Sequence, residues 1–418
     1  MNIVRQKLLS FRLSSLVIIF YIILLSLKQI RFVDDFQFLY YSPYMLLAIL
    51  FFIGFVLFLY AGRFHILDLM ILLLLCSLIV SAINSDNVFL FLTVYVLPIA
   101  GYFVFRVNLT KHMDIYKLFL YLSIFISSLL IVEFITENYT NNKVFNYEGL
   151  SIEYIQKGAI YGGNRMDKNV HPILQLIAPE YSYVERPLGV AMAPQLSGVL
   201  MACFILFLLS IIKYKHYLYF SHRKTIYLSM IMLFIALFMS LSGTGMLIFM
   251  VGSLLLFASK RNMFYIVFLA PLFVYLALFS RGYTYDGAGV FLLTYSFKLF
   301  NLFYSNLLSA DFVTLIIGGN TNQTADIDYL NFIVRFGVIG STLFLLLLLV
   351  VYYCWGKAFR YTIMDLPLIP VVLSILMANF HYDSIYRYPA SFLFFMIIGY
   401  ISYHYSISHN NYKKNINT

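Results

Sequence analysis

A short acidic segment and an arginine lie close together at the start of one long apolar run. The segment reads Asp326-Ile327-Asp328, and Arg335 follows seven residues after Asp328. If a helix begins near Asp328, both side chains share one face two turns apart. Such a pair could accept a proton from a hydroxyl group and hold an anion beside it. Either Asp alone is also expected at an ordinary helix N-terminus, whereas an Arg inside an apolar run needs a partner or a polar cavity.

A second arginine stands where a long polar segment meets the next apolar run, in Glu185-Arg186-Pro187-Leu188-Gly189. The guanidinium of Arg186 could form parallel hydrogen bonds to phosphate oxygens and would stay charged in a partly dry site. Pro187 and Gly189 favour a fixed turn at this point. The alternative is an interfacial anchor, whose charge extends from the end of the helix into the headgroup region.

Other ionisable residues lie near the ends of apolar runs. Arg281 follows one run directly, and His381, Asp383 and Arg387 occupy a short segment between the last two runs. Arg281 and Arg387 are therefore further candidates for binding an anion, although a solvated loop position explains each of them as well. Glu133, near the end of its own run, is likewise either a residue of a site at this face or a solvated residue.

Metal and nucleotide motifs are missing from the sequence. His171 has no partner at ligand spacing, and Cys76, Cys203 and Cys354 show no paired spacing. There is no His-Glu-x-x-His, Gly-x-x-x-x-Gly-Lys or Gly-x-Ser-x-Gly motif. The sequence therefore predicts no metal site and no cofactor, and it gives no support to an ATP-driven pump.

Hydropathy indicates which elements must position these residues. Of the 418 residues, 62% are hydrophobic and 11% are charged, whereas about a quarter are charged in soluble domains. We expect an all-α, polytopic integral membrane protein that forms one domain over residues 1–418. Runs near the length of a membrane span predict about twelve transmembrane helices. They cover residues 13–27, 43–61, 66–83, 88–104, 115–135, 189–212, 225–241, 246–257, 263–279, 329–353, 366–380 and 388–405.

The positions of Lys and Arg predict the orientation. Short loops rich in these residues face the cytoplasm, which places both termini inside and two long segments, residues 136–188 and 281–328, in the periplasm. Residues 290–308 are apolar enough for a thirteenth span, but Lys298 and Asn301 favour a helix in the outer interface or a re-entrant segment. The net charge of +10 is assigned to cytoplasmic loops rather than to nucleic-acid binding.

The order of these elements, from about Glu185 to Gly340, resembles the O-antigen polymerase and O-antigen ligase superfamily. The residues that carry the resemblance are Arg186-Pro187-Leu188-Gly189, Ser240-Leu241-Ser242-Gly243-Thr244-Gly245, Gly318-Gly319, Asp326-Ile327-Asp328-Tyr329-Leu330 and Gly337-Val338-Ile339-Gly340. Ligases usually have His-Asn-x-Tyr-Leu at the start of the late span, and Asp326 stands where they have the His. This departure favours the polymerase (Wzy-type) branch.

The resemblance implies a metal-independent, GT-C-like glycosyltransferase of the bacterial inner membrane. It would transfer a growing glycan from undecaprenyl pyrophosphate to a lipid-linked repeat unit at the periplasmic face. Asp326 or Asp328 would act as the base, while Arg186, Arg335, Arg281 and Arg387 would hold the pyrophosphate. The expected partners are undecaprenyl-pyrophosphate-linked oligosaccharide, membrane lipid and a chain-length regulator. A ligase of the same superfamily and a lipid-linked oligosaccharide flippase or other transporter are the alternatives.

Overall fold

The computed structural model describes residues 37–60, 64–107, 115–139, 169–170, 183–184, 187, 189, 191, 194–257, 301, 304–305, 307–308, 310–319, 328–358, 368–378 and 390–416. Apart from turns, these residues are helical except for strands β1 (Asn169–Val170) and β2 (Tyr183–Val184), which pair antiparallel.

Five helical segments among the described residues are long and apolar enough to cross a membrane. They are Ile66–Ile83, Val88–Arg106, Ile115–Thr136, Gln195–Lys213 and Phe332–Gly356. Large apolar side chains also point outward from the bundle, and Phe52 and Leu349 are each 65% exposed. Such surfaces are favourable against lipid and costly in water. The chain is therefore an α-helical protein with the pattern of a multi-pass membrane protein.

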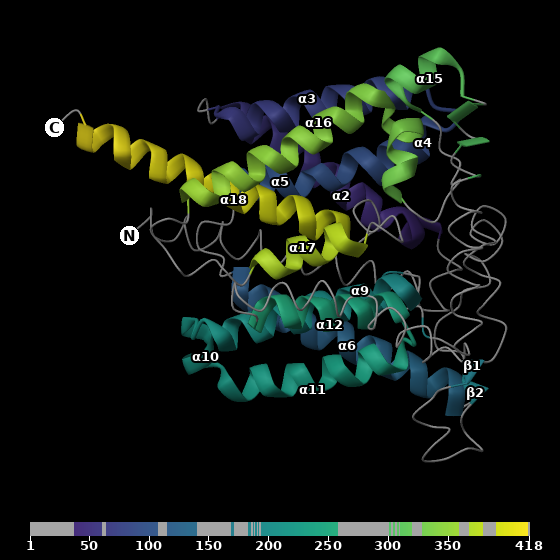
Figure 1. Ribbon diagram of the computed structural model, residues 1–418, viewed down its shortest axis with the longest axis vertical. Helices are drawn as coiled ribbons and strands as arrows, with labels where there is room; N and C mark the ends of the chain where they lie inside the picture. Colours follow the sequence, from purple (N-terminus) through teal and green to yellow (C-terminus); the bar gives the residue numbers. More distant parts are fainter. Residues whose placement is uncertain are drawn as a thin grey trace.

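The helices form two groups. In the first, α3 packs on α16, α2 packs on α5, and α18 contacts both α5 and α16. The second contains α6, α9, α11 and α12, with α9 at its centre. Helix α17 contacts α9, α12 and α18 and so joins the groups, as Figure 1 shows. The bounds of these helices are α2 Gln37–Tyr60, α3 Ile66–Ile83, α5 Ala100–Arg106, α6 Ile115–Tyr139, α9 Pro194–Lys213, α11 Arg223–Met239, α12 Gly243–Phe257, α16 Asp328–Ala358, α17 Ile369–Ala378 and α18 Ala390–Ile416.

The segment between α3 and α5 is irregular although it lies in an apolar span. It consists of α4 (Val88–Phe91), the π-helical turn η2 (Leu92–Val96) and the 3-10 turn η3 (Leu97–Ile99). Pro98 has no backbone N–H and cannot continue a regular hydrogen-bond ladder. π-helical turns are rare in proteins, and those that occur often lie at functional sites.

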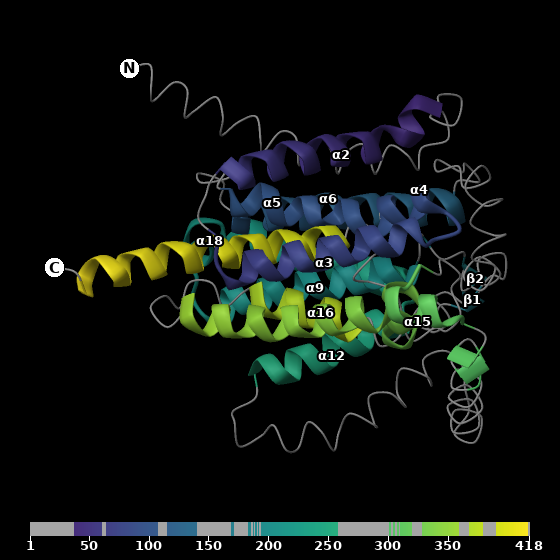
Figure 2. The ribbon, with the colours of Figure 1, turned by 90° about the horizontal axis from the view of Figure 1, so that it is seen from above.

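Different elements lie at the two ends of the bundle. Strands β1 and β2 and the short helix α15 (Phe312–Ile317) lie at one end, which we call the β1–β2 end (Figure 1). The opposite end, here called the α10 end, holds α10 (Tyr217–Ser221) and the last turns of α18. Seen from above, α2 and α12 lie at opposite edges (Figure 2).

The two ends match the predicted division of loops. Residues of both long polar segments lie at the β1–β2 end, because β1 and β2 belong to 136–188 and α15 belongs to 281–328. Lys213, Lys215, Arg223 and Lys224 flank α10 at the other end. That the β1–β2 end faces the periplasm stays a prediction.

Several predicted spans agree with helices, and others do not. Helix α3 has the predicted bounds. Helix α9 begins at Pro194 rather than at residue 189, and α18 continues to Ile416 rather than ending at residue 405. The predicted spans at 13–27 and 263–279 lie outside the described residues, as does most of 290–308.

Candidate functional site

Arg335 lies inside α16 and is almost completely buried, with 2% of its surface exposed. Its Cζ atom lies 5.9 Å from the centre of the Tyr95 ring, an arrangement that is worth about 0.5–2 kcal/mol. The surrounding segment, Phe332–Gly356, is one of the five candidate membrane spans. A permanent cation is therefore held within an apolar helix, the kind of residue that marks a functional site in membrane proteins.

Helix α16 is broken two residues after this arginine. Gly337 has φ 65° and ψ 177°, which is not helical, and a Cβ atom there would collide with the backbone of Ile316. Only glycine adopts this conformation at little cost. The break therefore lets the end of α15 lie directly against the backbone of α16.

The backbone groups around the break are satisfied by neighbouring segments. The N–H of Gly319 donates to the carbonyl oxygen of Arg335 at 2.8 Å. Asn84 Nδ2 donates to the carbonyl oxygen of Gly318 at 2.6 Å, and Ser81 Oγ donates to that of Ile317 at 2.5 Å. The first bond pairs a carbonyl group of α16 beside the break, and the other two pair carbonyl groups at the end of α15, as backbone groups within a membrane protein require. Gly318 and Gly319 both have positive φ, at 87° and 120°.

Helix α15 is itself fixed at its start. Asp311 caps it, because its carboxylate accepts the N–H of Thr314 at 3.2 Å. The hydrogen bonds with Thr314 lower the pKa of Asp311 below its ordinary value. One end of α15 is thus held by a local cap and the other by the break in α16.

The irregular turn η2 meets the broken helix at this arginine. The rings of Phe91 and Tyr95 pack on that of Phe336, with centroids 6.2 Å and 5.2 Å away. All three side chains are buried. Tyr95 of η2 therefore contacts both Arg335 and Phe336, so that the irregular part of one candidate span lies beside the break in another.

The sequence predicted the start of α16 correctly. The helix begins at Asp328, so Arg335 follows two turns later within the same segment. The side chain of Asp328 lies outside the described residues, and so do Asp326, Arg186, Arg281 and Arg387. Their convergence on Arg335 stays a prediction.

Glu133 is buried rather than solvated, which corrects one of its two interpretations. It is 1% exposed in α6, and its Oε2 accepts the N–H of Gly189 at 2.8 Å. Gly189 has φ 62°, and a Cβ atom there would collide with the hydroxyl group of Ser197. The turn that precedes α9 is therefore fixed between α6 and α9.

The Ser240–Gly245 hairpin packs on the first turns of α9. Ser242 Oγ donates to the carbonyl oxygen of Gln195 at 3.0 Å and accepts the N–H of Gly245 at 3.0 Å. A Cβ atom on Gly198 would collide with Ser242. The sequence assigned no role to this hairpin, and the structure shows that it closes one side of α9 at the β1–β2 end.

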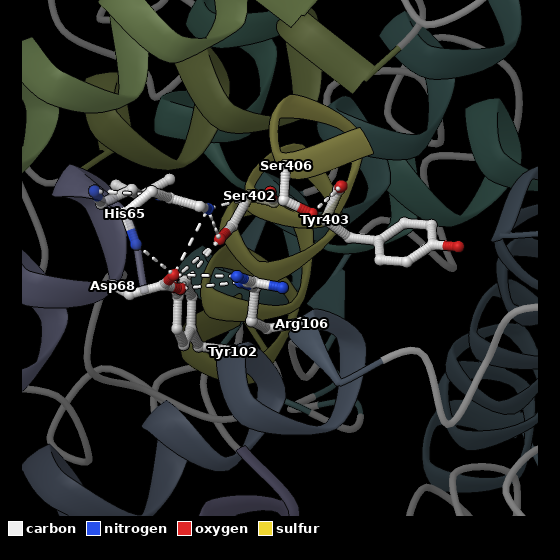
Figure 3. Close-up of polar contacts among 8 residues, drawn as sticks. His65, Asp68, Tyr102, Arg106, Ser402, Tyr403 and Ser406 are labelled. Atoms are coloured by element: carbon white, nitrogen blue, oxygen red, sulfur yellow. Dashed lines mark hydrogen bonds and ion pairs between the residues drawn. The ribbon is translucent and has the colours of Figure 1, made fainter. Parts of the chain in front are cut away.

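A third polar cluster lies toward the α10 end and was not predicted. The carboxylate of Asp68, on α3, stands at its centre (Figure 3). Arg106 donates to it through Nε at 2.7 Å and Nη2 at 2.9 Å. Further donors are Tyr102 Oη at 2.5 Å, Ser402 Oγ at 3.2 Å and the N–H of His65 at 3.0 Å. The cluster therefore joins α3, α5 and α18.

The partners of Asp68 explain why the sequence did not reveal this cluster. Asp68 is the one charged residue in the apolar run 66–83, which is a signal of intramembrane function or pairing. Arg106 lies just after the predicted span 88–104, and Ser402 is 334 residues away from Asp68 along the chain. Asp68 is fully buried and well supplied with donors, which is what a structural ion pair requires.

The chain matches no protein-family model, no curated protein and no solved structure. Among the described residues, no group of three or more His, Cys, Asp or Glu side chains is placed to hold a metal ion.

Proposed function

We propose that this protein is a polysaccharide polymerase of the bacterial inner membrane. It transfers a growing glycan from undecaprenyl pyrophosphate to a lipid-linked repeat unit on the periplasmic side. The observation that carries the proposal is the burial of Arg335 where the break in α16 meets the irregular turn η2. Interrupted membrane helices are typical of sites that bind charged groups within a bilayer.

The chemistry suits a guanidinium in such a place. In the transfer, the acceptor hydroxyl oxygen bonds to the anomeric carbon while the bond from that carbon to the pyrophosphate oxygen breaks. Negative charge grows on the leaving pyrophosphate, and an arginine fixed in a dry site stabilises it. The hydroxyl proton passes to a carboxylate, for which Asp326 and Asp328 are the candidates. The driving force resides in the pyrophosphate ester, so the reaction needs no nucleotide.

Purified protein provides the direct test. Reconstituted with the lipid-linked repeat unit of its host, it should produce longer chains without ATP. Arg335→Met should abolish elongation, and Arg335→Lys should recover only part of it, because an ammonium ion does not reproduce the planar fork of the guanidinium. Full elongation by Arg335→Met in well-folded protein would refute the assignment of this site.

Deletion in the host separates the polymerase from a ligase. Loss of a polymerase should leave surface lipid that carries a single repeat unit and no ladder of longer chains. Loss of a ligase should remove the single unit as well.

The buried pair of Asp68 and Arg106 favours a transporter as the second candidate, since a carboxylate inside a span can serve a proton or substrate pathway. The purified protein would then move lipid-linked repeats across a vesicle membrane without lengthening them. Under the polymerase proposal the pair is structural. Elongation per folded molecule should then survive its replacement by two leucines.

A further inference from the structure

An exposed arginine near the α10 end contacts aromatic rings from two helices. Arg223 is the first residue of α11, and its Cζ atom lies 5.6 Å from the centre of the Tyr219 ring and 5.7 Å from that of Tyr227. Tyr219 belongs to α10, and Tyr227 follows one turn later in α11. Such contacts are favourable even at an exposed site. The guanidinium is thus oriented at the end of the bundle opposite β1 and β2 (Figure 1).

The positive charge at this end has no acidic counterpart nearby in the sequence, because residues 186–285 contain no Asp or Glu. Lys215, Arg223 and Lys224 are exposed, and none of them forms an ion pair within the described part of the chain. Lys213 differs, because its ammonium group donates to a backbone carbonyl oxygen at the end of α12. Three exposed cations can therefore meet an anion from outside the chain.

The surface next to these cations is apolar. Phe220 in α10 is 72% exposed, and Leu228 and Ile231 in α11 are 53% and 58% exposed. Leu228 lies five residues beyond Arg223, which is about 7.5 Å along a helix. The headgroup region on one side of a bilayer is about 5–8 Å thick. Cations and apolar side chains therefore follow each other along α11 at the spacing of a phospholipid headgroup and its acyl chains.

This order of groups distinguishes a phospholipid from other anions. A free phosphate or a water-soluble acidic segment would pair with Arg223 and Lys224 but would leave Phe220 and Leu228 in water. A phospholipid covers both surfaces, because its phosphate meets the cations while its acyl chains cover the apolar side chains. A zwitterionic headgroup brings its own ammonium group to the phosphate, so three exposed cations favour a lipid with a net negative charge.

We propose that Arg223 and Lys224 bind the headgroup phosphate of an anionic phospholipid of the phosphatidylglycerol type. The rings of Tyr219 and Tyr227 orient the guanidinium, whose planar fork suits two phosphate oxygens. The acyl chains lie along the outer face of α11 from Leu228 onward. The predicted orientation places this lipid in the cytoplasmic leaflet. The inference goes beyond the proposed function, since it concerns the other end of the molecule and no step of the transfer.

Two substitutions that each remove one exposed positive charge test the site. Arg223→Gln removes the oriented guanidinium. Lys215→Gln is the matched control, because Lys215 precedes α10 at the same end and is not part of the Arg223 cluster. In neutral detergent without lipid, both variants should melt at the temperature of the wild type, since isolated exposed charges contribute little to stability.

The measurement is native mass spectrometry of the full chain in neutral detergent, titrated with phosphatidylglycerol. The wild type should retain this lipid with an affinity about tenfold or more above that for phosphatidylcholine, and millimolar inorganic phosphate should not displace it. Arg223→Gln should raise the Kd for phosphatidylglycerol about tenfold or more, from the loss of a charged two-point contact with phosphate. Lys215→Gln should raise it by no more than about threefold.

Four results would overturn the inference. They are the absence of phosphatidylglycerol binding, equal binding of phosphatidylcholine, displacement by inorganic phosphate, and equal losses in Arg223→Gln and Lys215→Gln. The third would indicate a site for free phosphate, and the fourth would indicate a diffuse basic surface. Lipid binding is measured without any reaction, so failure of the polymerase proposal leaves this inference standing, and its own failure leaves the polymerase proposal standing.

Discussion

Removing Arg106 alone should destabilise the protein more than removing Arg106 and Asp68 together. In Arg106→Leu, the buried carboxylate loses its two shortest nitrogen contacts, at 2.7 Å and 2.9 Å. Breaking a buried ion pair from one side costs about 3–5 kcal/mol. Because Tyr102, Ser402 and the N–H of His65 still donate to Asp68, we expect the lower part of this range. Even about 3 kcal/mol changes the ratio of folded to unfolded protein by roughly two orders of magnitude.

The double variant Asp68→Leu/Arg106→Leu should recover much of that loss. Tyr102 Oη and Ser402 Oγ lie 2.9 Å apart and can still bond to each other. The main remaining cost is the N–H of His65, which loses its acceptor, at about 1–3 kcal/mol. If the two residues acted independently, the costs of Arg106→Leu and Asp68→Leu would add to about 6–10 kcal/mol. Because the double variant should cost about 1–3 kcal/mol, the expected coupling energy between the two residues is about 3 kcal/mol or more.

The assay is equilibrium unfolding by SDS in mixed micelles, followed through the fluorescence of Trp355, the single tryptophan of the chain. Arg223→Leu is the control. Arg223 is an exposed arginine that lies over the rings of Tyr219 and Tyr227, and its loss should have little effect. An Arg106→Leu variant as stable as the wild type, or additive costs in the double variant, would refute the reasoning.

Three further predictions concern the break in α16 and its surroundings. Gly337→Ala should lower the melting temperature and stop elongation because of its positive φ and the collision with α15, whereas Gly356→Ala in the same helix meets nothing within 4 Å and should be neutral or stabilising by up to about 1 kcal/mol. Tyr95→Leu should weaken pyrophosphate binding roughly 2- to 30-fold, measured by competition with inorganic pyrophosphate, and Tyr95→Phe should retain the ring contact and the affinity. Because its pKa is lowered, Asp311 stabilises α15 above its unfolded pKa of about 3.9, and this contribution should disappear as the pH falls through the lower folded value. Amide exchange in α15, corrected for the intrinsic effect of pH, should show that loss in the wild type but not in Asp311→Asn.

The sequence predicted the bounds of a helix well where polar residues mark both ends of its apolar run. Helix α3 has the predicted bounds because His65 and Asp68 cap its start, and the polar residues from Asn84 onward end it. The start of α9 was placed five residues early for a related reason. Residues 189–193 are apolar, but Gly189 is held in a turn by Glu133, a residue 56 positions away.

Pairing between distant residues could not be predicted from one sequence. Hydropathy identified the runs that contain Asp68 and Ser402 without indicating that they touch, because contact depends on how separate helices pack. The same limit applies to Glu133, whose burial arises from a segment that approaches from the end of a long loop. Arg335 was easier to identify, since a permanent charge in an apolar run is unusual by itself.

The positions of irregular backbone within the candidate spans also distinguish the region around Arg335 from the helices that support it. The turns η2 and η3 and the break at Gly337 all fall within Val88–Arg106 and Phe332–Gly356. In lipid, each interruption would expose backbone groups at a cost of several kilocalories per mole. Here Gly319 pairs the carbonyl group of Arg335 at the break, and Ser81 and Asn84 pair carbonyl groups at the end of α15 beside it. A regular helix would need none of these partners and would suffice for a purely structural span. Toward the α10 end, in contrast, the Asp68 cluster joins the regular helices α3, α5 and α18. The irregular parts of the two spans thus lie near the buried guanidinium and the regular helices form the support, which is the arrangement expected if Arg335 belongs to the working part of the protein.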